Sequence, residues 1–225
     1  MDILIVYGLV GISLLITMGA QAFISSSYSK YSKQRNSNNL TGAEAARIML
    51  DKNGLTNVKV QMVSGYLSDH YDPRNKTVNL STNNYNEPSV ASVAVACHEC
   101  GHALQDKNGY TFLKIRRSII PIVNFCSYAG YLAIILGSVL GFFGLIWLGI
   151  IAECIILFFQ LVTLPVEFNA SKRALQEIEK ERFLTGNEIS SGKTMLTSAA
   201  LTYVASVATT VIQILRLVLM YGKKR

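Results

Sequence analysis

Four long apolar runs limit this chain to folds that place helices in a lipid bilayer. The first run, Ile3 to Ile24, has Gln21 as its only strongly polar residue. At about 1.5 Å per residue, a helix of this length matches the roughly 30 Å hydrocarbon core of a membrane. Later runs cover Ile119 to Leu140, Phe142 to Leu164 and Met195 to Tyr221. The sequence therefore predicts a helical membrane protein.

The composition agrees with this interpretation. Half of the 225 residues are hydrophobic and 16% are charged, well below the roughly one quarter of soluble domains. The basic excess, 21 Lys and Arg against 14 Asp and Glu, lies beside the apolar runs, which indicates membrane topology rather than nucleic-acid binding. Four Cys are too few for a disulfide scaffold, and the high apolar content excludes a disordered chain.

The first and last runs each allow more than one interpretation. A cleaved secretory signal has a basic start and a short apolar core, whereas this chain begins Met1-Asp2 and its first run is long. We therefore expect a retained transmembrane helix over 1–24. The last run, 195–221, contains Arg216 and many small polar residues. It is predicted to be a membrane-associated helix that spans, re-enters or packs against the others.

The second and third runs are joined without any charged residue, which predicts an antiparallel transmembrane hairpin over 119–164. Residues 25–118 contain 12 Lys and Arg against 7 Asp and Glu, whereas the hairpin tip has neither Lys nor Arg. Because basic residues favour the cytoplasmic side, we expect 25–118 and 165–194 to lie there in a multi-pass cell-membrane protein. Lys223 to Arg225 would oppose this rule if the last helix spans fully.

The polar segment 25–118 is predicted to begin with a linker and a short helix. Residues 25–40 are polar and have no periodicity, which is typical of a linker. Thr41 and Glu44 then form a capping-box pattern before apolar residues, so we expect a helix over about 42–53.

Two strands and a buried helix follow. Val58–Val63 and Thr77–Ser81 alternate with period two, which predicts two short antiparallel strands, the second at a sheet edge. Small and apolar residues over 89–105 predict a buried helix. The predicted fold class is thus mainly α, a multi-span membrane protein with a small cytosolic α+β zincin-like domain that carries a short antiparallel sheet.

The buried helix contains the pattern His-Glu-x-x-His over 98–102. Side chains at i and i+4 share one helix face, so both imidazoles of this pattern can bind one Zn²⁺, with Glu99 beside them. Zinc lowers the pKa of a coordinated water and polarises a scissile carbonyl, while Glu99 can act as the general base. A chance pattern of core histidines is the alternative. Two of only three His in the chain occur here, which favours a metal site.

A catalytic zinc site needs a third protein ligand and an open fourth position. The candidates are His70, the remaining histidine, and acidic residues on the same side of the membrane. Glu167 follows Pro165, which is predicted to end the third span, and begins an amphipathic helix over about 166–183. Alternatively, Glu167 is a carboxylate favoured by the helix dipole.

The chain resembles known membrane proteases. Its order of span, HExxH domain, apolar hairpin and Glu-x-x-Ala is similar to the membrane gluzincins of the HtpX type. Four segments are similar to the bacterial YugP family of neutral zinc metallopeptidases: His70–Arg74, Val78–Ser81, Ala96–Gln105 and Leu164–Ser171. The resemblance covers nearly the whole chain. It implies that one Zn²⁺ per chain is bound by His98, His102 and Glu167, with Glu99 as general base.

The resemblance also bears on three further residues. Asn169 stands where the family commonly has Asp, so it can hydrogen-bond only as a neutral group. We expect Asn169 and Ser171 to form hydrogen bonds to the metal ligands and so to adjust the properties of the metal site. His70 is placed near the strand Val78–Ser81, where an extended substrate would pair, and would donate to the oxyanion. The alternative is that His70 is a surface turn residue.

Three other polar or reactive residues have structural interpretations. Cys97 and Cys100 flank His98 but point away from the metal face, so we expect them to pack in the core. Glu153 lies within the third span, where a carboxylate marks a functional site or a structural pair with Arg216 or nearby hydroxyls.

These features predict an integral membrane zinc endopeptidase. Peptides or membrane proteins are its expected substrates, the lipid bilayer its surroundings, and nucleic acid is not an expected partner. The alternative is a membrane scaffold or chaperone-like binding protein that keeps zinc for stability without cleaving. A transporter is disfavoured, because the paired broken-helix repeats of that class are missing from the sequence.

Overall fold

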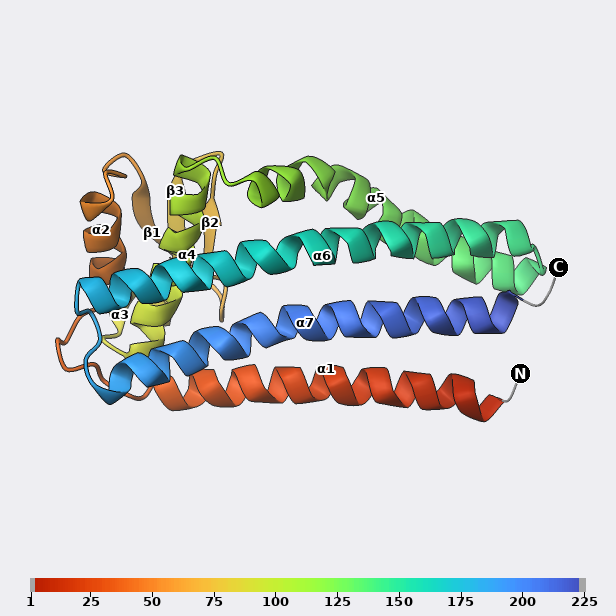
Figure 1. The fold of residues 1–225 in the computed structure, drawn as a ribbon, viewed down its shortest axis with the longest axis horizontal. Coiled ribbons are helices and arrows are strands. Elements are labelled where there is room, and N and C mark those ends of the chain that lie inside the picture. Colours follow the sequence, from red (N-terminus) through yellow and green to blue (C-terminus); the bar gives the residue numbers. More distant parts are fainter. Residues whose placement is uncertain (1–2, 223–225) are drawn as a thin grey trace. The chain divides into compact units, whose positions relative to one another are not determined.

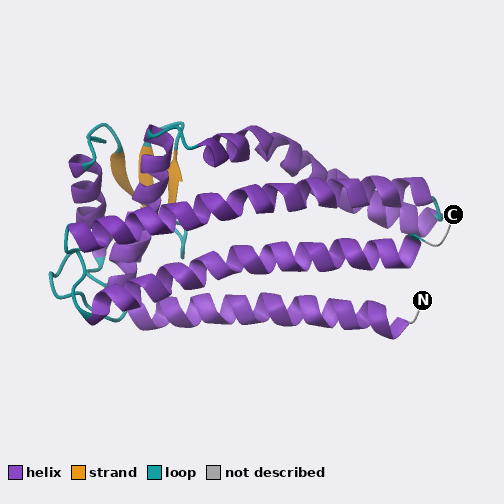
Figure 2. Cartoon of the chain, viewed as in Figure 1, coloured by secondary structure: helices purple, strands orange, loops and turns teal. Residues whose placement is uncertain are grey.

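The computed structural model describes residues 3–222, so Met1, Asp2 and the basic Lys223 to Arg225 lie outside the described residues. Helices dominate, and a small sheet is confined to the first half of the chain (Figures 1 and 2). The elements in order are α1 (Ile3–Tyr31), α2 (Gly42–Lys52), β1 (Lys59–Val63), β2 (His70–Asp72), β3 (Thr77–Ser81), α3 (Thr82–Asn86), α4 (Val90–Lys107), α5 (Thr111–Leu140), α6 (Phe143–Lys180) and α7 (Asn187–Tyr221).

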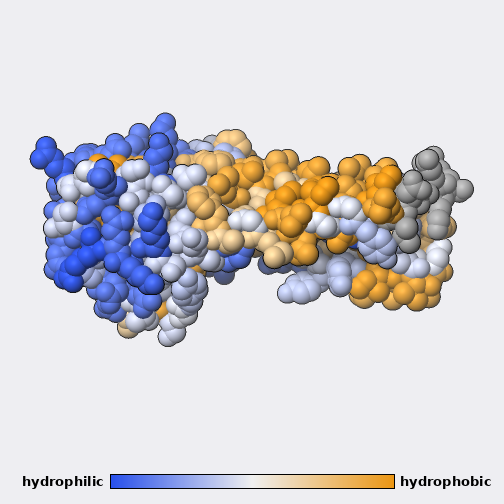
Figure 3. Space-filling view, turned by 90° about the horizontal axis from the view of Figure 1, so that it is seen from below, coloured by the Kyte–Doolittle hydropathy of each residue, from blue (hydrophilic) through white to orange (hydrophobic). Residues whose placement is uncertain are grey.

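The described chain divides into two compact units, each built from several segments. The first, which we call the membrane unit, comprises residues 3–21, 114–165 and 201–222. The second, the polar unit, comprises 22–113 and 166–200. On the face drawn in Figure 3, hydrophobic residues predominate on the membrane unit and hydrophilic residues on the polar unit.

Four helices, α1, α5, α6 and α7, are long and apolar enough to cross a membrane, as the four apolar runs predict. Large apolar side chains such as Leu4, Tyr128 and Val139 are at least 78% exposed, which suits contact with lipid rather than water. The connection between α5 and α6 is a tight turn in which Gly141 has a φ of +66°. Glycine adopts this backbone conformation without strain, and it lets the two helices run antiparallel.

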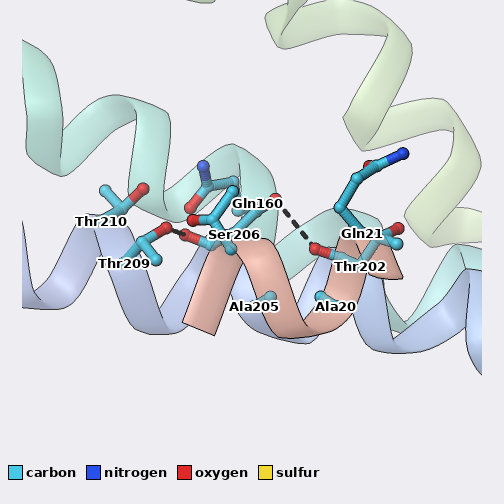
Figure 4. A pocket seen from close by; sticks show the side chains of 9 residues that line it. Ala20, Gln21, Gln160, Thr202, Ala205, Ser206, Thr209 and Thr210 are labelled. Atoms are coloured by element: carbon cyan, nitrogen blue, oxygen red, sulfur yellow. Dashed lines mark hydrogen bonds between the residues drawn. The ribbon is translucent and has the colours of Figure 1, made fainter. Parts of the chain in front are cut away.

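The membrane unit also contains polar side chains. A cavity of about 280 Å³ is lined by Thr, Ser, Gln and Ala from α1, α6 and α7, including Gln21, Gln160 and Thr202 (Figure 4). Glu153 of α6 lies within electrostatic range of Arg216 of α7, one of the partners expected for it.

Helix boundaries differ from the predicted ones at several places, and α5 and α7 each begin eight residues before the predicted apolar runs. Residues 25–31 of the predicted linker are helical, because Ile24, Tyr28 and Tyr31 form a buried stripe at i, i+4 and i+7 that extends α1 to Tyr31. Pro165 does not end a helix, since α6 runs through it to Lys180. A proline removes only one backbone donor, and a helix of this length tolerates that loss.

The predicted antiparallel pairing of the two strands is wrong. The sheet order is β1-β3-β2, in which β1 pairs with β3 in parallel and β2 pairs with β3 antiparallel. The prediction fails because of β2, a three-residue strand too short to show periodicity in the sequence. β2 pairs antiparallel with one edge of β3, and β1 pairs in parallel with the other edge. Thr77–Ser81 is therefore the central, fully buried strand, not an edge at which a substrate could pair.

The polar unit packs around α4. The predicted helix over about 42–53 is confirmed as α2, whose capping box joins Thr41 and Glu44. The predicted buried helix is also confirmed: α4 is capped by Ser89, which accepts a hydrogen bond from the Ser92 backbone N–H. Most of its side chains are buried against α2, α3 and the sheet, so α4 is held rigidly at the centre of the unit.

Candidate metal centre

His98 and His102 lie one turn apart on α4, as their spacing predicts. Their rings meet edge to face, with centroids 4.8 Å apart and an interplanar angle of 86°. This arrangement turns the Nε2 atom of each ring toward α6. Both imidazoles are therefore aimed at one point by the helix that the core holds most firmly.

Glu167 of α6 occupies that point. Its Oε2 atom lies 3.3 Å from His98 Nε2 and 3.6 Å from His102 Nε2, and the carboxylate is 3% exposed. The ligand atoms of these three residues lie within 4.8 Å of one another, the one group of this kind found among the described residues. The structure thus brings together the three residues that the resemblance implies as ligands.

Close packing of α4 on α6 makes this meeting possible. A Cβ added at Gly101 would lie 2.6 Å from the backbone oxygen of Ala170, a distance that real Cβ atoms do not adopt. Gly101 therefore lets the two helix backbones approach each other between the two histidines. Any larger residue at this position would push Glu167 away from them.

The other nitrogen of each ring has a hydrogen-bond partner outside the cluster. His98 Nδ1 lies 3.1 Å from the Ser171 hydroxyl, and His102 Nδ1 lies 3.0 Å from Gln105 Oε1. Asn169 Oδ1 accepts hydrogen bonds from Gln105 Nε2 at 3.1 Å and from Arg173 Nε at 2.8 Å. Ser171 thus contacts a predicted ligand directly, whereas Asn169 contacts the residue that contacts one.

Gln105 is a residue of the site that the sequence analysis does not predict. Its side chain is fully buried, and its Nε2 donates to the Val166 backbone oxygen at 2.7 Å. The available signal was its position, because a polar residue three places after His102 lies on the same face of an otherwise apolar helix.

Glu99 is buried beside the three-residue cluster. Burial raises the pKa of its carboxyl to about 7. The charge of His98 opposes this rise, while the carboxylates of Glu167 and Asp69 add to it. The backbone N–H of Tyr71 in β2 donates to Glu99 and also opposes the rise. A carboxyl with a pKa near neutrality can both accept and release a proton at physiological pH.

Strand β2 is held beside Glu99 by α4. The Tyr71 hydroxyl donates to Asp106 Oδ2 at 2.8 Å, and Lys76 forms an ion pair with the same carboxylate. His70 precedes Tyr71 but is exposed, with Nδ1 2.8 Å from the Ser68 backbone oxygen and Nε2 3.2 Å from Asn79 Nδ2. His70 lies outside the group formed by His98, His102 and Glu167.

Cys97 and Cys100 are buried in the core and also lie outside that group. Burial raises the pKa of both thiols well above their usual value. Because a thiol must ionise to bind zinc, these side chains fit the expected packing role better than a thiolate site.

The three clustered residues fit a zinc ion. Two imidazoles and one carboxylate are a donor set used by catalytic zinc sites. Bonds of about 2.0–2.2 Å at tetrahedral angles separate neighbouring ligand atoms by roughly 3.3–3.6 Å. The two distances from Glu167 Oε2 to the imidazole nitrogens, 3.3 and 3.6 Å, fall in this range. A zinc ion held by these three residues would keep a fourth position for a substrate or solvent.

The fold and the site define a class: a protein with four membrane-capable helices, whose polar unit holds the HExxH helix against a glutamate from a following helix. The chain belongs to the family described as "Putative neutral zinc metallopeptidase", whose model matches residues 6–222. It is similar to the "Putative membrane protease YugP" of Bacillus subtilis (strain 168), with 46% identity over 206 residues and 92% of each chain covered. No solved structure matches the chain.

Proposed function

We propose that the protein is a multi-pass membrane zinc endopeptidase of the gluzincin type, with His98, His102 and Glu167 as zinc ligands. The observation that carries the proposal is the meeting of three ligand atoms within 4.8 Å beside a buried carboxyl, Glu99. A zinc ion bound there would supply Lewis-acid chemistry, polarising a peptide carbonyl and favouring deprotonation of water.

Glu99 is proposed as the general base and then the general acid. Its carboxylate would take a proton from the attacking water and pass it to the leaving amine of the cleaved peptide bond. Two observations support this role. Burial raises the pKa of Glu99 to about 7, and the Tyr71 backbone N–H fixes the carboxylate in orientation. Because Tyr71 belongs to β2, this strand is the element of the polar unit best placed to contact a substrate chain.

The proposed substrates are membrane proteins or unfolded segments near the bilayer. Support comes from the four membrane-capable helices and from the membrane protease among the relatives. The proposed orientation places the site in the cytoplasm, because the polar segment 25–118 carries more basic than acidic residues. His70 is retained as a proposed contact for the substrate, since it lies on the same strand as Tyr71.

The alternative, a zinc-stabilised scaffold that cleaves nothing, would use the same three ligands. The replacement Glu99→Gln separates the two proposals, because it removes the base and leaves the ligands. In an endopeptidase, it should lower the hydrolysis of fluorescein-labelled casein by a factor of roughly 10² or more while zinc content stays unchanged.

Glu87→Gln is the matched control, because Glu87 is exposed in the same unit. It should leave both casein hydrolysis and zinc content at wild-type levels. Equal hydrolysis by wild type and Glu99→Gln would remove Glu99 from the mechanism. A wild-type protein with full zinc that cleaves neither casein nor a broad peptide library would favour the scaffold.

A further inference from the structure

Gln105 is a fully buried amide of α4 whose hydrogen-bond partners lie on α4 and α6. Burying an amide is unfavourable unless its donor and acceptor atoms find partners. Here Nε2 has two oxygen partners and Oε1 has one nitrogen partner. The side chain is therefore held in one orientation.

The partners of Gln105 show which end is nitrogen. The Val166 backbone oxygen can only accept a hydrogen bond, and it lies 2.7 Å from Gln105 Nε2. The second partner, Asn169 Oδ1, is identified as the amide oxygen because it lies 2.8 Å from the Arg173 guanidinium, which can only donate. Oε1 must then be the Gln105 atom that faces His102 Nδ1 at 3.0 Å.

This orientation determines where His102 carries its proton. An amide oxygen cannot donate, so the hydrogen bond requires a proton on His102 Nδ1. In the neutral ring the lone pair is then on Nε2, the atom that faces Glu167. His98 differs, because its partner is the Ser171 hydroxyl, which can either donate or accept.

The same amide also holds the glutamate side of the site. Val166 immediately precedes Glu167 in α6, so the bond to its carbonyl fixes the backbone next to the proposed carboxylate ligand. One buried side chain thus joins His102 on α4 to the residue beside Glu167 on α6.

We propose that Gln105 is a positioning residue for metal binding, which accepts from His102 and holds it as its Nδ1–H tautomer. This inference rests on the proposed function, because it assumes that His102 and Glu167 bind zinc. Gln105 acts through His102 and need not touch the substrate. Outer partners of this kind typically change metal affinity 10–100-fold when they are removed.

The test compares Gln105→Met with Gln105→Glu in the full-length protein. Met keeps the length of the side chain but cannot accept from His102, so zinc affinity, measured by competition with a chelator, should fall about 10–100-fold. Glu keeps an acceptor for the Nδ1 proton and loses the bond to Val166, so zinc affinity should stay within about threefold of wild type. The visible absorption spectrum of the Co²⁺ form should change in the Met variant and persist in the Glu variant.

Matched controls use Gln176, which is exposed on α6. Gln176→Met and Gln176→Glu should leave zinc affinity unchanged. If Gln105 had a purely structural role, Gln105→Glu should lower zinc affinity more than Gln105→Met does. The Glu variant would bury a charge and also lose the hydrogen bond to the Val166 backbone oxygen on α6. Zinc binding by Gln105→Met at wild-type affinity, or a loss in Gln105→Glu as large as in Gln105→Met, overturns the proposal. If Gln105→Met does not fold, loss of zinc affinity in a folded Gln105→Glu protein still overturns it, and retention supports it.

Failure of this inference is distinguishable from failure of the proposed function. Zinc affinity and the Co²⁺ spectrum report on Gln105 whether or not the protein cleaves casein. The proposed enzyme is tested by Glu99→Gln, which leaves the bonds of Gln105 intact.

Discussion

At the scale of single residues, the site depends on side chains that the sequence pattern specifies and on others that it does not. The HExxH pattern identifies His98, Glu99 and His102 because the i and i+4 positions of a helix face one direction. Glu167 is a candidate from its place after Pro165, and the family resemblance selects it as the ligand, because it lies 65 positions after His102 and no local spacing links the two. Gln105 has no recognised spacing, and its role follows from contacts with another helix.

Gly101 gives a prediction at this scale. A Cβ introduced by Gly101→Ala would lie 2.6 Å from the Ala170 backbone oxygen, so α4 and α6 must move apart. Displacement of catalytic groups by about 1 Å can reduce activity about 10²-fold, and we expect a loss of casein hydrolysis of this order. Gly19→Ala is the control, because its added Cβ would meet no atom within 4 Å. Full activity in Gly101→Ala would contradict the proposed role of close helix packing.

At the scale of elements, helix starts with local signals were predictable, whereas strand pairing was not. The capping box of Thr41 and Glu44 uses neighbouring residues, so the start of α2 can be read from the sequence. The parallel pairing of β1 with β3 depends on β2, a three-residue strand without periodicity. The passage of α6 through Pro165 likewise depends on packing, which overrides the local tendency of proline to end a helix.

The capping box itself can be tested by replacement. Thr41→Ala removes the side-chain acceptor for the Glu44 backbone N–H and should lower the free energy of unfolding by about 1 kcal/mol. Thermal unfolding in detergent should therefore occur a few degrees lower, by roughly 2–4 °C. A melting temperature equal to that of wild type would show that the cap contributes nothing to the stability of α2.

The stabilising effect of Glu44, the carboxylate of this capping box, should depend on pH. Hydrogen bonds from the Thr41 backbone N–H and hydroxyl lower the pKa of Glu44 below its usual 4.5. A group whose folded pKa is lowered stabilises the fold above its unfolded pKa and loses this effect as pH falls. Glu44→Gln should thus destabilise the protein at pH 7, and the difference from wild type should shrink as pH falls below 4.5 and vanish once pH passes the lowered folded pKa. A constant difference across this range would contradict the assignment.

At the scale of the whole molecule, composition and apolar runs predicted a mainly helical membrane protein, and the four membrane-capable helices agree. The direction in which the chain crosses the membrane is a proposal, because it depends on the distribution of basic residues and not on internal contacts.

Cysteine labelling tests this topology. In a protein whose native cysteines are replaced, Cys introduced for the exposed Lys33 and Glu179 should react with an impermeant maleimide only when the cytoplasmic side is open. Cys at position 142, at the exposed hairpin tip, should react from the outside. Position 224 reports whether the last helix crosses. Labelling of positions 33 and 179 from outside intact cells would reverse the proposed orientation.

Metal analysis of the purified protein tests whether His98, His102 and Glu167 form a zinc site. Wild type should contain close to one zinc per chain. His98→Ala, His102→Ala and Glu167→Ala should each lose most of it while the protein still elutes as a folded species in detergent. His70→Ala, which replaces the one other histidine of the chain, should keep the metal. Full zinc occupancy in the three ligand variants would contradict the assignment of these residues as zinc ligands.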